Sequence, residues 1–401
     1  MRILQLAQFL PPVSGGEERH VWALSRALAS RGHEVTLLGL ATSTDDPGED
    51  FQDGVRLVRV RPSIAKLPML YSDNTRPHSL PVPDPAVNWA IRTELQTGGF
   101  DVAHAHNWIV NSALGPAARA GVPVVMTLHD YSHVCATKRL MQFGQQRCPG
   151  PAPRRCLFCA SDHYGPIKGP VTLLANTFAA RQRAHGLTAV AAVSSAVAGA
   201  VASGSWAPLQ PKVIPNFIPD DIVLDNVVRP DEDAPLVFAG DLTADKGVPA
   251  LLAAYRMLAN PPLLFLAGRG GEHWDLPAGG RWLGPLSHAA TMDALRAARA
   301  VIVPSVWDDP CPTVVLEAMA AGRPVIASAA GGIVDMVADG ETGLLVTPGD
   351  AADLASGISR LLDNPETAHE YGLAGRQRVR AFTVSATVSR LENMYACALR
   401  L

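Results

Sequence analysis

The stretch Ala300–Ser328, AVIVPSVWDDPCPTVVLEAMAAGRPVIAS, contains a complete strand–loop–helix–strand unit. The apolar run AVIVPS predicts a buried strand, and the proline-rich segment Trp307–Pro312 predicts the loop that follows it. A helical stretch then ends at Gly322, and Pro324 leads into a second strand, PVIAS. Two apolar strands joined by a helix predict a parallel βαβ unit.

The same alternation of strands and helices runs through nearly the whole chain. Strand-like runs in the first half are RILQLAQF, HEVTLLGL, VRLVRV, DVAHAH, PVVMTLH and AVAAVS, and those in the second half are PLVFAGDL, PLLFLAG, AVIVPS, PVIAS and GLLVTP. The proline-broken segment KVIPNFIPDD separates the two sets, and a last helix is expected at 383–401. We therefore predict an α/β protein of two doubly wound parallel-sheet domains, 1–215 and 216–382, that face a cleft.

Composition and charge limit the classes of function. The chain has 401 residues, which is longer than one ordinary core, and it is 48% hydrophobic and 18% charged. A net charge of −3 argues against a general nucleic-acid binder, which needs a basic face. The segment MRILQLAQFLPP predicts a first strand rather than a signal peptide, and no run approaches the ~18 apolar residues of a membrane span. We expect a cytoplasmic protein whose six cysteines are thiols or metal ligands.

The turn Ser14-Gly15-Gly16-Glu17 lies between the first strand and the first helix. Ser14 followed by Glu17 fits a capping box. The two glycines would let a ligand approach the backbone, and the amino end of a helix favours an anion. A phosphate site and a plain tight turn both remain open for this segment.

Two further segments place polar side chains at strand ends. In FDVAHAHN, His104 and His106 share one face of a strand, and His106 falls at its carboxyl end, where ligands bind in open α/β sheets. His129 ends the next strand in the same way, and packed histidines are the simpler interpretation. In GDLTADKG, Lys246 follows another strand and would reach a diphosphate as a point charge, unless it is a solvated surface lysine.

The opening stretch carries two acids. Asp309 lies in the predicted loop, and Glu317 lies in the helix that follows it. A carboxylate so placed can accept hydrogen bonds from sugar hydroxyls, and the backbone N–H groups of Thr313 and Val314 can bind an anion. The alternative is that the acids only favour the helix dipole.

Four cysteines lie in an insertion, 131–170, of the first domain. Cys135, Cys148, Cys156 and Cys159 have the spacing C-x12-C-x7-C-x2-C. This set predicts a closed, structural zinc site, with an iron–sulfur cluster less favoured and four reduced thiols as the alternative. Because the insertion is rich in proline and glycine and has little core of its own, a metal would give it a fold.

Taken together, the motifs resemble the retaining glycosyltransferases of family 4, which have the GT-B fold of two Rossmann-like domains. The resemblance starts with PPVSGGEERHVWALSRALASRGHEV and continues through FDVAHAH, KVIPNF and GDLTADKG. It ends with DPCPTVVLEAMAAGRPVIAS and AAGGIVDMVADGETGLLV, which are the most specific part. It implies an amino-terminal acceptor domain, a carboxyl-terminal nucleotide-sugar domain and a last helix that packs back on the first domain.

The resemblance also assigns roles to residues. It implies that Glu317 holds the nucleotide ribose, Asp309 the hydroxyls of the donor sugar and Lys246 the diphosphate. His106 touches the donor sugar, and Gly15 and Gly16 line the diphosphate side, with Thr313 and Val314 as further donor contacts. The candidate catalytic residues are His106, Lys246 and Asp309.

This sequence departs from the family pattern at three positions. Asp309 stands where the family usually has Glu, and Asp335 where the motif GGxxE would have Glu. Asp241 stands where the family often has Arg, so an acid replaces one diphosphate cation. The affinity for the donor should fall unless Lys246, Arg269 or the glycine turn compensates.

The predicted function is transfer of a sugar, with retention and without a catalytic metal, from a nucleoside-diphosphate sugar to a hydroxyl acceptor. UDP is the favoured nucleotide and GDP the next, and the acceptor is a glycan, a lipid-linked molecule or a natural product. Nucleic acid is not an expected partner. The helical run VTLLANTFAARQRAHGL is mildly basic and suggests peripheral membrane contact, although a plain domain helix explains it more simply. The alternatives are an inactive GT-B protein that only binds nucleotide sugars and a GT-B nucleotide-sugar epimerase.

Overall fold

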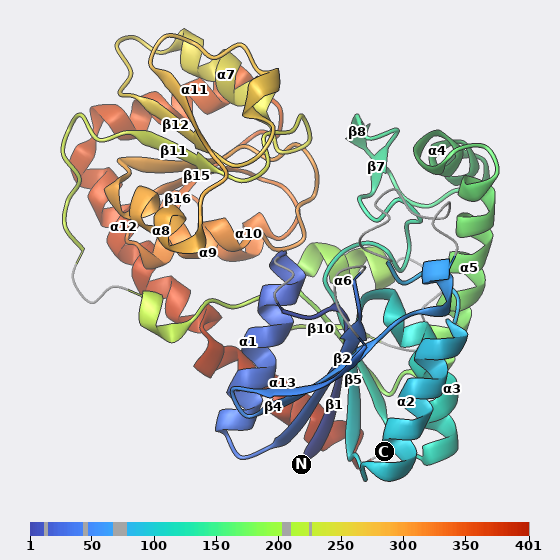
Figure 1. The fold of residues 1–401 in the computed structure, drawn as a ribbon. Coiled ribbons are helices and arrows are strands. Elements are labelled where there is room, and N and C mark those ends of the chain that lie inside the picture. The colour runs from blue at the N-terminus through green and yellow to red at the C-terminus, as the bar shows by residue number, and fades with distance from the viewer. Residues whose placement is uncertain (12–14, 43–46, 67–77, 203–209, 224–226, 401) are drawn as a thin grey trace. The chain divides into compact units, whose positions relative to one another are not determined.

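The computed structural model describes residues 1–11, 15–42, 47–66, 78–202, 210–223 and 227–400. The chain forms two compact units. The first contains Met1–Phe143, Cys148–Pro215 and Thr387–Leu401, and the second contains Gly144–Arg147 and Asn216–Ala386. Each unit is built on a parallel sheet covered by helices (Figure 1).

Among the described residues, the first sheet has the strand order β10-β9-β6-β5-β1-β2-β4-β3, and only β3 runs antiparallel to its neighbour. Its strands are β1 (Arg2–Phe9), β2 (Glu34–Leu40), β3 (Gly48–Gln52), β4 (Val55–Val60), β5 (Val102–His106), β6 (Val124–Leu128), β9 (Ala189–Ala192) and β10 (Lys212–Val213). Nearly all of β1 and β5 is buried, as expected for strands with helices on both faces.

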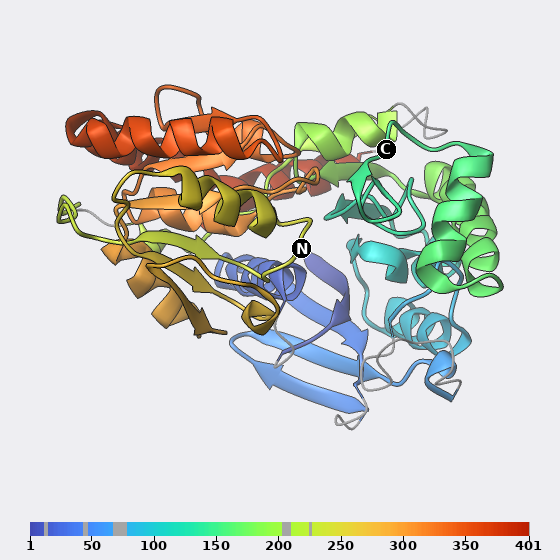
Figure 2. The ribbon, with the colours of Figure 1, turned by 90° about the horizontal axis from the view of Figure 1, so that it is seen from above.

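The helices of the first unit lie in two layers. They are α1 (Gly16–Ser30), α2 (Pro85–Thr97), α3 (Val110–Ala120), α4 (Pro153–Tyr164), α5 (Lys168–Gly186), α6 (Ser195–Ala202) and most of α13 (Val384–Ala398), with short 3-10 turns η1 (Ser63–Lys66) and η3 (Asn107–Ile109). Figures 1 and 2 show α1 on one face of the strands and α2 and α3 on the other. On the α1 side, α13 is held by a hydrogen bond from Arg31 to Ser389 and an ion pair between Arg31 and Glu392.

The second sheet has the order β13-β12-β11-β14-β15-β16 among the described residues, and every paired strand is parallel. Its strands are β11 (Leu236–Ala239), β12 (Leu264–Ala267), β13 (Gly280–Gly284), β14 (Ala300–Val303), β15 (Val325–Ser328) and β16 (Gly343–Val346). Its helices are α7 (Val248–Met257), α8 (His288–Ala297), α9 (Thr313–Ala320), α10 (Ile333–Met336), α11 (Ala351–Asp363) and α12 (Pro365–Val379), with the short turns η4 (Asp220–Ile222), η5 (Gly271–His273) and η6 (Arg380–Phe382). Apolar residues of β11, β12, α7 and α11 form its core.

The strand orders locate the functional edge of each sheet. In the first sheet the chain moves outward from β1 to β2 and then returns to β5 on the other side of β1. In the second it moves from β11 to β12 and then returns to β14 beside β11. Open α/β sheets bind ligands at the carboxyl ends of the strands where the order reverses. Ligand sites are therefore expected at the ends of β1 and β5, and of β11 and β14.

The predicted α/β class and the two parallel sheets are confirmed. Predicted element ends are also close to the observed ones. The first helix ends at Ser30, and Gly32 follows with φ +85°, a conformation that favours glycine.

The insertion differs from the expected loop with little core. It contains the helix α4 and a short hairpin, β7 (Met141–Gln142) with β8 (Gln146–Arg147). A Cβ atom at Gly169 would lie only 2.3 Å from the carbonyl oxygen of Ala160, so α4 and α5 pack backbone to backbone. Helix packing thus orders the insertion, which the sequence pattern did not predict.

Candidate functional site

The second unit brings two of the predicted site residues into direct contact. Lys246 follows β11 and Asp309 follows β14, so both lie at the edge where the strand order reverses. The Nζ atom of Lys246 lies 2.5 Å from Oδ2 of Asp309 and 5.2 Å from the centroid of the Trp307 ring. The Asp309 side chain is 8% exposed and that of Lys246 is 31% exposed. The pair is partly shielded, and the lysine remains accessible from solvent.

Glycines fix the two loops that carry this pair. Gly247 has φ +81°, and a Cβ there would lie 1.8 Å from the carbonyl oxygen of Pro304. Gly331 has φ +56°, and a Cβ there would lie 2.2 Å from the carbonyl oxygen of Asp309. The N–H of Gly332 donates to that same oxygen at 2.7 Å. Any larger residue at the first two positions would displace the loops, which therefore present Lys246 and Asp309 in a defined geometry.

Glu317 is buried within α9, where His288 is its partner. The His288 ring nitrogen Nε2 lies 3.0 Å from Oε1 of Glu317, and the Glu317 side chain is 9% exposed. His288 is the first residue of α8, whose amino end is capped by the Ser287 hydroxyl. The sequence pattern did not single out His288, because the two residues lie on different helices and no motif joins them.

The amino end of α9 lies in the same neighbourhood. Thr313 and Val314 are its first residues, after Pro312 at the N-cap position. The first N–H groups of any α-helix have no intrahelical partner, so this end offers hydrogen-bond donors to an anion. The helix begins shortly after the loop residue Asp309. The edge of this sheet therefore offers an anion both the ammonium group of Lys246 and the first backbone N–H groups of α9.

Asp241, which replaces an expected cation, is paired with Arg269. Ala239 of β11 pairs with Ala267 of β12, and Asp241 and Arg269 each lie two residues beyond that pair. Arg269 donates to both carboxylate oxygens, with Nε–Oδ1 at 2.9 Å and Nη2–Oδ2 at 2.6 Å. The guanidinium of Arg269 therefore places a positive charge at the end of the adjacent strand, β12. It is held there by Asp241, the acid that stands where a cation was expected.

In the first unit, His106 lies in a chain of buried hydrogen bonds. Its Nε2 lies 3.0 Å from Oε1 of Gln5, and its Nδ1 lies 2.9 Å from Nε2 of His129. The Gln5 amide nitrogen lies 3.3 Å from the Tyr395 hydroxyl, and that hydroxyl lies 2.6 Å from Nδ1 of His104. Because an amide oxygen can only accept, His106 donates through Nε2 and accepts through Nδ1 from His129.

Burial holds the pKa of His106 well below its ordinary range, so the ring is neutral. The structure thus ties a predicted site histidine to the last helix through Gln5 and Tyr395, which the sequence pattern did not indicate. The predicted contact between His106 and the donor sugar remains a prediction.

The glycine turn begins α1 directly. Gly15 is the N-cap residue, and Ser14 of the predicted capping box lies outside the described residues. A Cβ at Gly16 would meet none of the described atoms within 4 Å. The Glu17 carboxylate accepts a hydrogen bond from Nδ2 of Asn107 at 3.0 Å, and Asn107 has φ +65°.

Glu17 is an unusual carboxyl group. Its Oε1 is sealed from solvent and has no hydrogen-bond partner among the described residues. Burial, with smaller contributions from Glu18 and Asp130, raises the pKa of Glu17 from 4.5 to about 8. The group is therefore mostly protonated at neutral pH.

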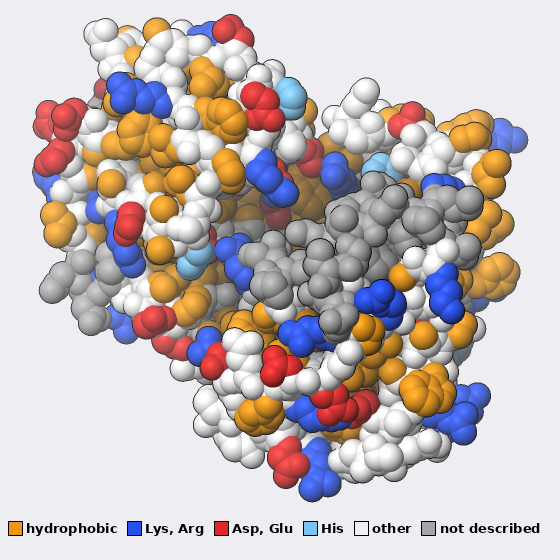
Figure 3. All heavy atoms as spheres, viewed as in Figure 1, with side chains coloured by type: hydrophobic (Ala, Val, Ile, Leu, Met, Phe, Trp, Pro, Cys, Tyr) orange, Lys and Arg blue, Asp and Glu red, His pale blue; other side chains and the backbone are white. Residues whose placement is uncertain are grey.

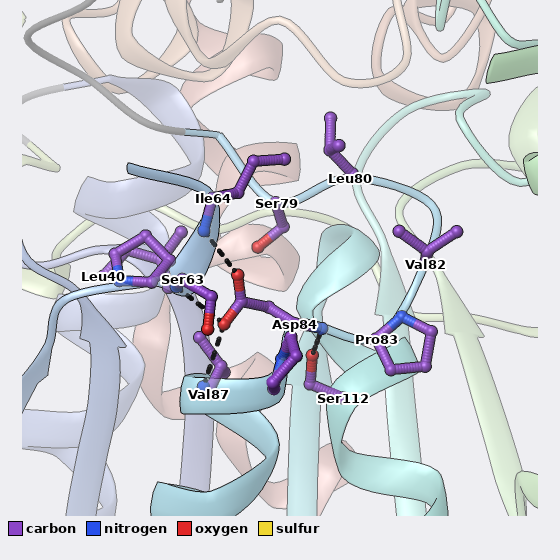
Figure 4. A pocket seen from close by; sticks show the side chains of 12 residues that line it. Leu40, Ser63, Ile64, Ser79, Leu80, Val82, Pro83, Asp84, Val87 and Ser112 are labelled. Carbon is purple, nitrogen blue, oxygen red and sulfur yellow. Dashed lines mark hydrogen bonds between the residues drawn. The ribbon is translucent and has the colours of Figure 1, made fainter. Parts of the chain in front are cut away.

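A pocket of about 230 Å³ lies at the ends of β2 and β4 and the start of α2 (Figure 4). Its walls are mostly apolar and include Leu40, Ile64, Leu80, Val82 and Val87, with hydroxyls from Ser63, Ser79 and Ser112. Asp84 lies in it but accepts hydrogen bonds from the backbone N–H groups of Ser63, Ile64, Ala86 and Val87. Its carboxylate therefore holds the loop on the helix. No sequence motif had indicated this pocket.

The predicted zinc or iron–sulfur site is not supported. Across the described part of the chain, no group of three or more His, Cys, Asp or Glu side chains is arranged to hold a metal ion. The sulfurs make local contacts instead: Cys135 with Thr137, Cys148 with the carbonyl of Gly150, Cys156 with the N–H of Ala152, and Cys159 with the N–H of Phe143. Burial and the neighbouring thiols raise the pKa values of Cys156 and Cys159.

The arrangement of two parallel-sheet units with polar edges is that of the GT-B glycosyltransferases. The structure aligns with sucrose-phosphate synthase from Thermosynechococcus elongatus over 99% of this chain and 98% of that one, with a TM-score of 0.73 and 20% identity. It also aligns with HepE from Anabaena, solved in complex with UDP-glucose, over 99% of this chain and 100% of that one, with a TM-score of 0.66 and 17% identity. The fold is therefore GT-B.

Sequence comparison gives the family. Residues 14–222 match the family model described as Glycosyltransferase Family 4, and residues 224–378 match the one described as Glycosyl transferases group 1. A D-inositol 3-phosphate glycosyltransferase from Kribbella flavida is 30% identical, with 92% of this chain and 87% of that protein covered. The chain belongs to glycosyltransferase family 4, and it is an enzyme that uses a nucleotide sugar.

Proposed function

We propose that this enzyme moves a sugar from a UDP-sugar, with a GDP-sugar as the next choice, to a hydroxyl acceptor with retention of configuration. The observation that carries the proposal is the Lys246–Asp309 pair at the edge of the second sheet, in the loop that leads to the helix of Glu317. UDP is placed first because a protein of similar fold, HepE, was solved with UDP-glucose.

The donor would be held by the second unit. Lys246 exchanges its contact with Asp309 for one with the diphosphate, and Asp309 is then free to accept hydrogen bonds from the donor-sugar hydroxyls. Glu317 accepts from the ribose hydroxyls, and His288 holds its carboxylate in place. The first N–H groups of α9 add donors for the diphosphate.

Arg269 is the candidate replacement for the cation that was expected at position 241. Its side chain is 75% exposed, and Asp241 fixes it in a bidentate contact at the strand edge. We propose that Arg269 contributes the second positive charge near the diphosphate. Its pairing with Asp241 reduces that charge, as the contact with Asp309 does for Lys246 until that contact is exchanged.

The proposed reaction exchanges one carbon–oxygen bond for another and transfers one proton. The acceptor oxygen attacks the anomeric carbon on the face from which the diphosphate departs, and the carbon–oxygen bond to the phosphate breaks. The electron pair goes to the diphosphate, and one of its oxygens takes the proton of the acceptor hydroxyl. Lys246 and the amides of α9 stabilise the negative charge that grows on the diphosphate. No step is assigned to a metal ion.

The first unit would bind the acceptor. The pocket beside α2 has room for a small ring or a short apolar group, and its three serine hydroxyls can orient polar atoms. We propose that part of the acceptor binds there. The insertion 131–170 belongs largely to the same unit and would influence which acceptor binds.

Thermal unfolding with UDP-, GDP-, ADP- and TDP-sugars tests the donor. A ligand at ~100 times its dissociation constant adds about 2.7 kcal/mol, which is roughly 5–11 °C for a unit of this size. Sugars of one nucleotide should raise the midpoint of thermal unfolding of the wild type. Glu317→Gln should reduce this rise, whereas the surface variant Glu341→Gln should leave it unchanged.

A transfer assay then separates the functions. Transfer with a retained anomeric configuration, read by NMR, supports the proposal, and inversion would refute it. Binding with neither transfer nor hydrolysis would identify a non-catalytic binding protein. Conversion of the donor sugar in the absence of any acceptor would identify an epimerase.

A further inference from the structure

The helix α5 has its polar and apolar faces reversed relative to an ordinary surface helix. Its buried residues are Gly169, Asn176, Ala179, Ala180, Arg183 and Ala184. Its most exposed side chains include Val171 at 61%, Leu174 at 60% and Phe178 at 65%, preceded by Ile167 at 79%. The spacing of 4, 3 and 4 residues places these four in one stripe along the helix.

The buried face fixes this orientation. Arg183 is 0% exposed, and it donates to Oδ1 of Asn111 at 3.1 Å and to Oδ1 of Asn176 at 2.9 Å. Gly169 packs on the backbone of Ala160, where a larger residue would collide. Turning the helix to bury its apolar stripe would leave a guanidinium without these contacts and would break the close packing. The stripe therefore faces outward in the folded unit.

The neighbouring helix extends the stripe into a patch. Phe158 on α4 is 63% exposed and Leu157 is 40% exposed. Figure 3 shows hydrophobic side chains along the edge of the molecule that α4 and α5 form in Figure 1. Single exposed apolar side chains are ordinary, but a contiguous patch of large ones marks an interaction surface. We call the exposed residues of α4 and α5, with Ile167, the α4–α5 face.

The α4–α5 face is also basic. Between Pro153 and Gly186 the sequence has five Lys and Arg residues, one of which is the buried Arg183, and one acid, Asp162. Of the basic residues, Arg154, Lys168 and Arg181 are exposed. An apolar stripe flanked by cations fits the headgroup region of an anionic bilayer.

We propose that the α4–α5 face binds an anionic lipid surface, with α5 lying in the plane of the interface. A self-pairing of two copies would bring like charges together, because a twofold interface places the same patch on both sides. Among the described residues, no helix is long and apolar enough to cross a bilayer. The proposal does not depend on the transfer reaction.

Co-sedimentation of the full chain with lipid vesicles tests the proposal. Vesicles of phosphatidylcholine with about 30% phosphatidylglycerol, which gives an anionic surface, should bind the protein, and pure phosphatidylcholine should bind it much less. Phe178→Ser should lower the partition about tenfold or more, because burial of that side chain is lost. Phe51→Ser is the matched control, since Phe51 is 70% exposed on β3 of the same unit.

The charges have their own test. Lys168→Gln and Arg181→Gln should each lower binding to anionic vesicles about fivefold, the equivalent of about 1 kcal/mol per cation. Arg92→Gln, on the exposed side of α2, should change it little. Equal binding to neutral vesicles, or no loss with Phe178→Ser, would overturn the proposal. A concentration-dependent dimer in light scattering that Phe178→Ser abolishes would assign the face to a second copy instead.

Discussion

Replacing Glu17 with glutamine should stabilise the protein, and increasingly so as the pH rises from 5 to 7. In the folded state burial raises the pKa of Glu17 to about 8, whereas the unfolded chain ionises near 4.5. The folded state therefore keeps a proton that the unfolded state releases, and the wild type loses stability as the pH rises through this window. The introduced amide would imitate the protonated acid, and its oxygen could still accept the hydrogen bond from Asn107.

The size of the stabilisation by Glu17→Gln follows from the shift in the pKa of Glu17. One pKa unit corresponds to about 1.36 kcal/mol, so the advantage of Glu17→Gln should grow by about 2.7 kcal/mol between pH 5 and pH 7. For a unit of this size that is roughly 5–11 °C in the midpoint of thermal unfolding. Above pH 8 the advantage should stop growing, because Glu17 then ionises in the folded state as well.

Thermal unfolding of both proteins at half-unit pH steps measures this difference. Trp108, which is buried in the same unit, provides a local fluorescence signal. Glu34→Gln, at a highly exposed carboxylate, controls for the loss of one negative charge. A difference between Glu17→Gln and the wild type that stays constant from pH 5 to pH 7 would refute the assignment of a buried, protonated carboxyl group.

Three substitutions and one chemical reaction test the remaining assignments. Arg269→Ala should weaken donor binding by about 1.5–3 kcal/mol in calorimetry. Asp241→Asn should leave donor binding equal or stronger. Weaker binding by Asp241→Asn than by Arg269→Ala would exclude Arg269 as a phosphate contact. Val82→Trp should fill the pocket and raise the acceptor KM with donor affinity unchanged, and an unchanged KM would place the acceptor elsewhere. Cys156 and Cys159 should alkylate more slowly at pH 8 than a free thiol, because their pKa values are raised; fast reaction seen by mass spectrometry would contradict this.

The sequence predicted the fold well because most strands of the two sheets are short apolar runs, whereas the exposed strand β3, GEDFQ, has no such pattern and was not predicted. The residues after β11 and β14 could also be located, since their place relative to strand ends is a local property. The side chains that contact these site residues could not be predicted. Glu317 meets His288 and Asp241 meets Arg269 across separate elements, and only the folded chain shows these contacts.

The cysteine prediction remains without support for a different reason. Pro153 opens a helix that carries Cys156 and Cys159 three residues apart, a spacing compatible with a metal site, but the described side chains form no group of three or more ligands. A proline at the first helical position is a start signal, so the helix itself could have been predicted. The His106 chain was missed for another reason, because Gln5 and Tyr395 lie at opposite ends of the sequence and no pattern relates them.

The contact between Lys246 and Asp309 has a consequence for selectivity among cellular anions. In the structure the lysine is paired with a carboxylate at 2.5 Å. Under the proposed function, a small ion such as inorganic phosphate would gain little by displacing that carboxylate. A nucleotide sugar can compensate for the displacement, because its hydroxyls give the released carboxylate new partners. The ion pair would thus exclude ligands that satisfy only one of its two members, and it would keep the site available where free phosphate is abundant.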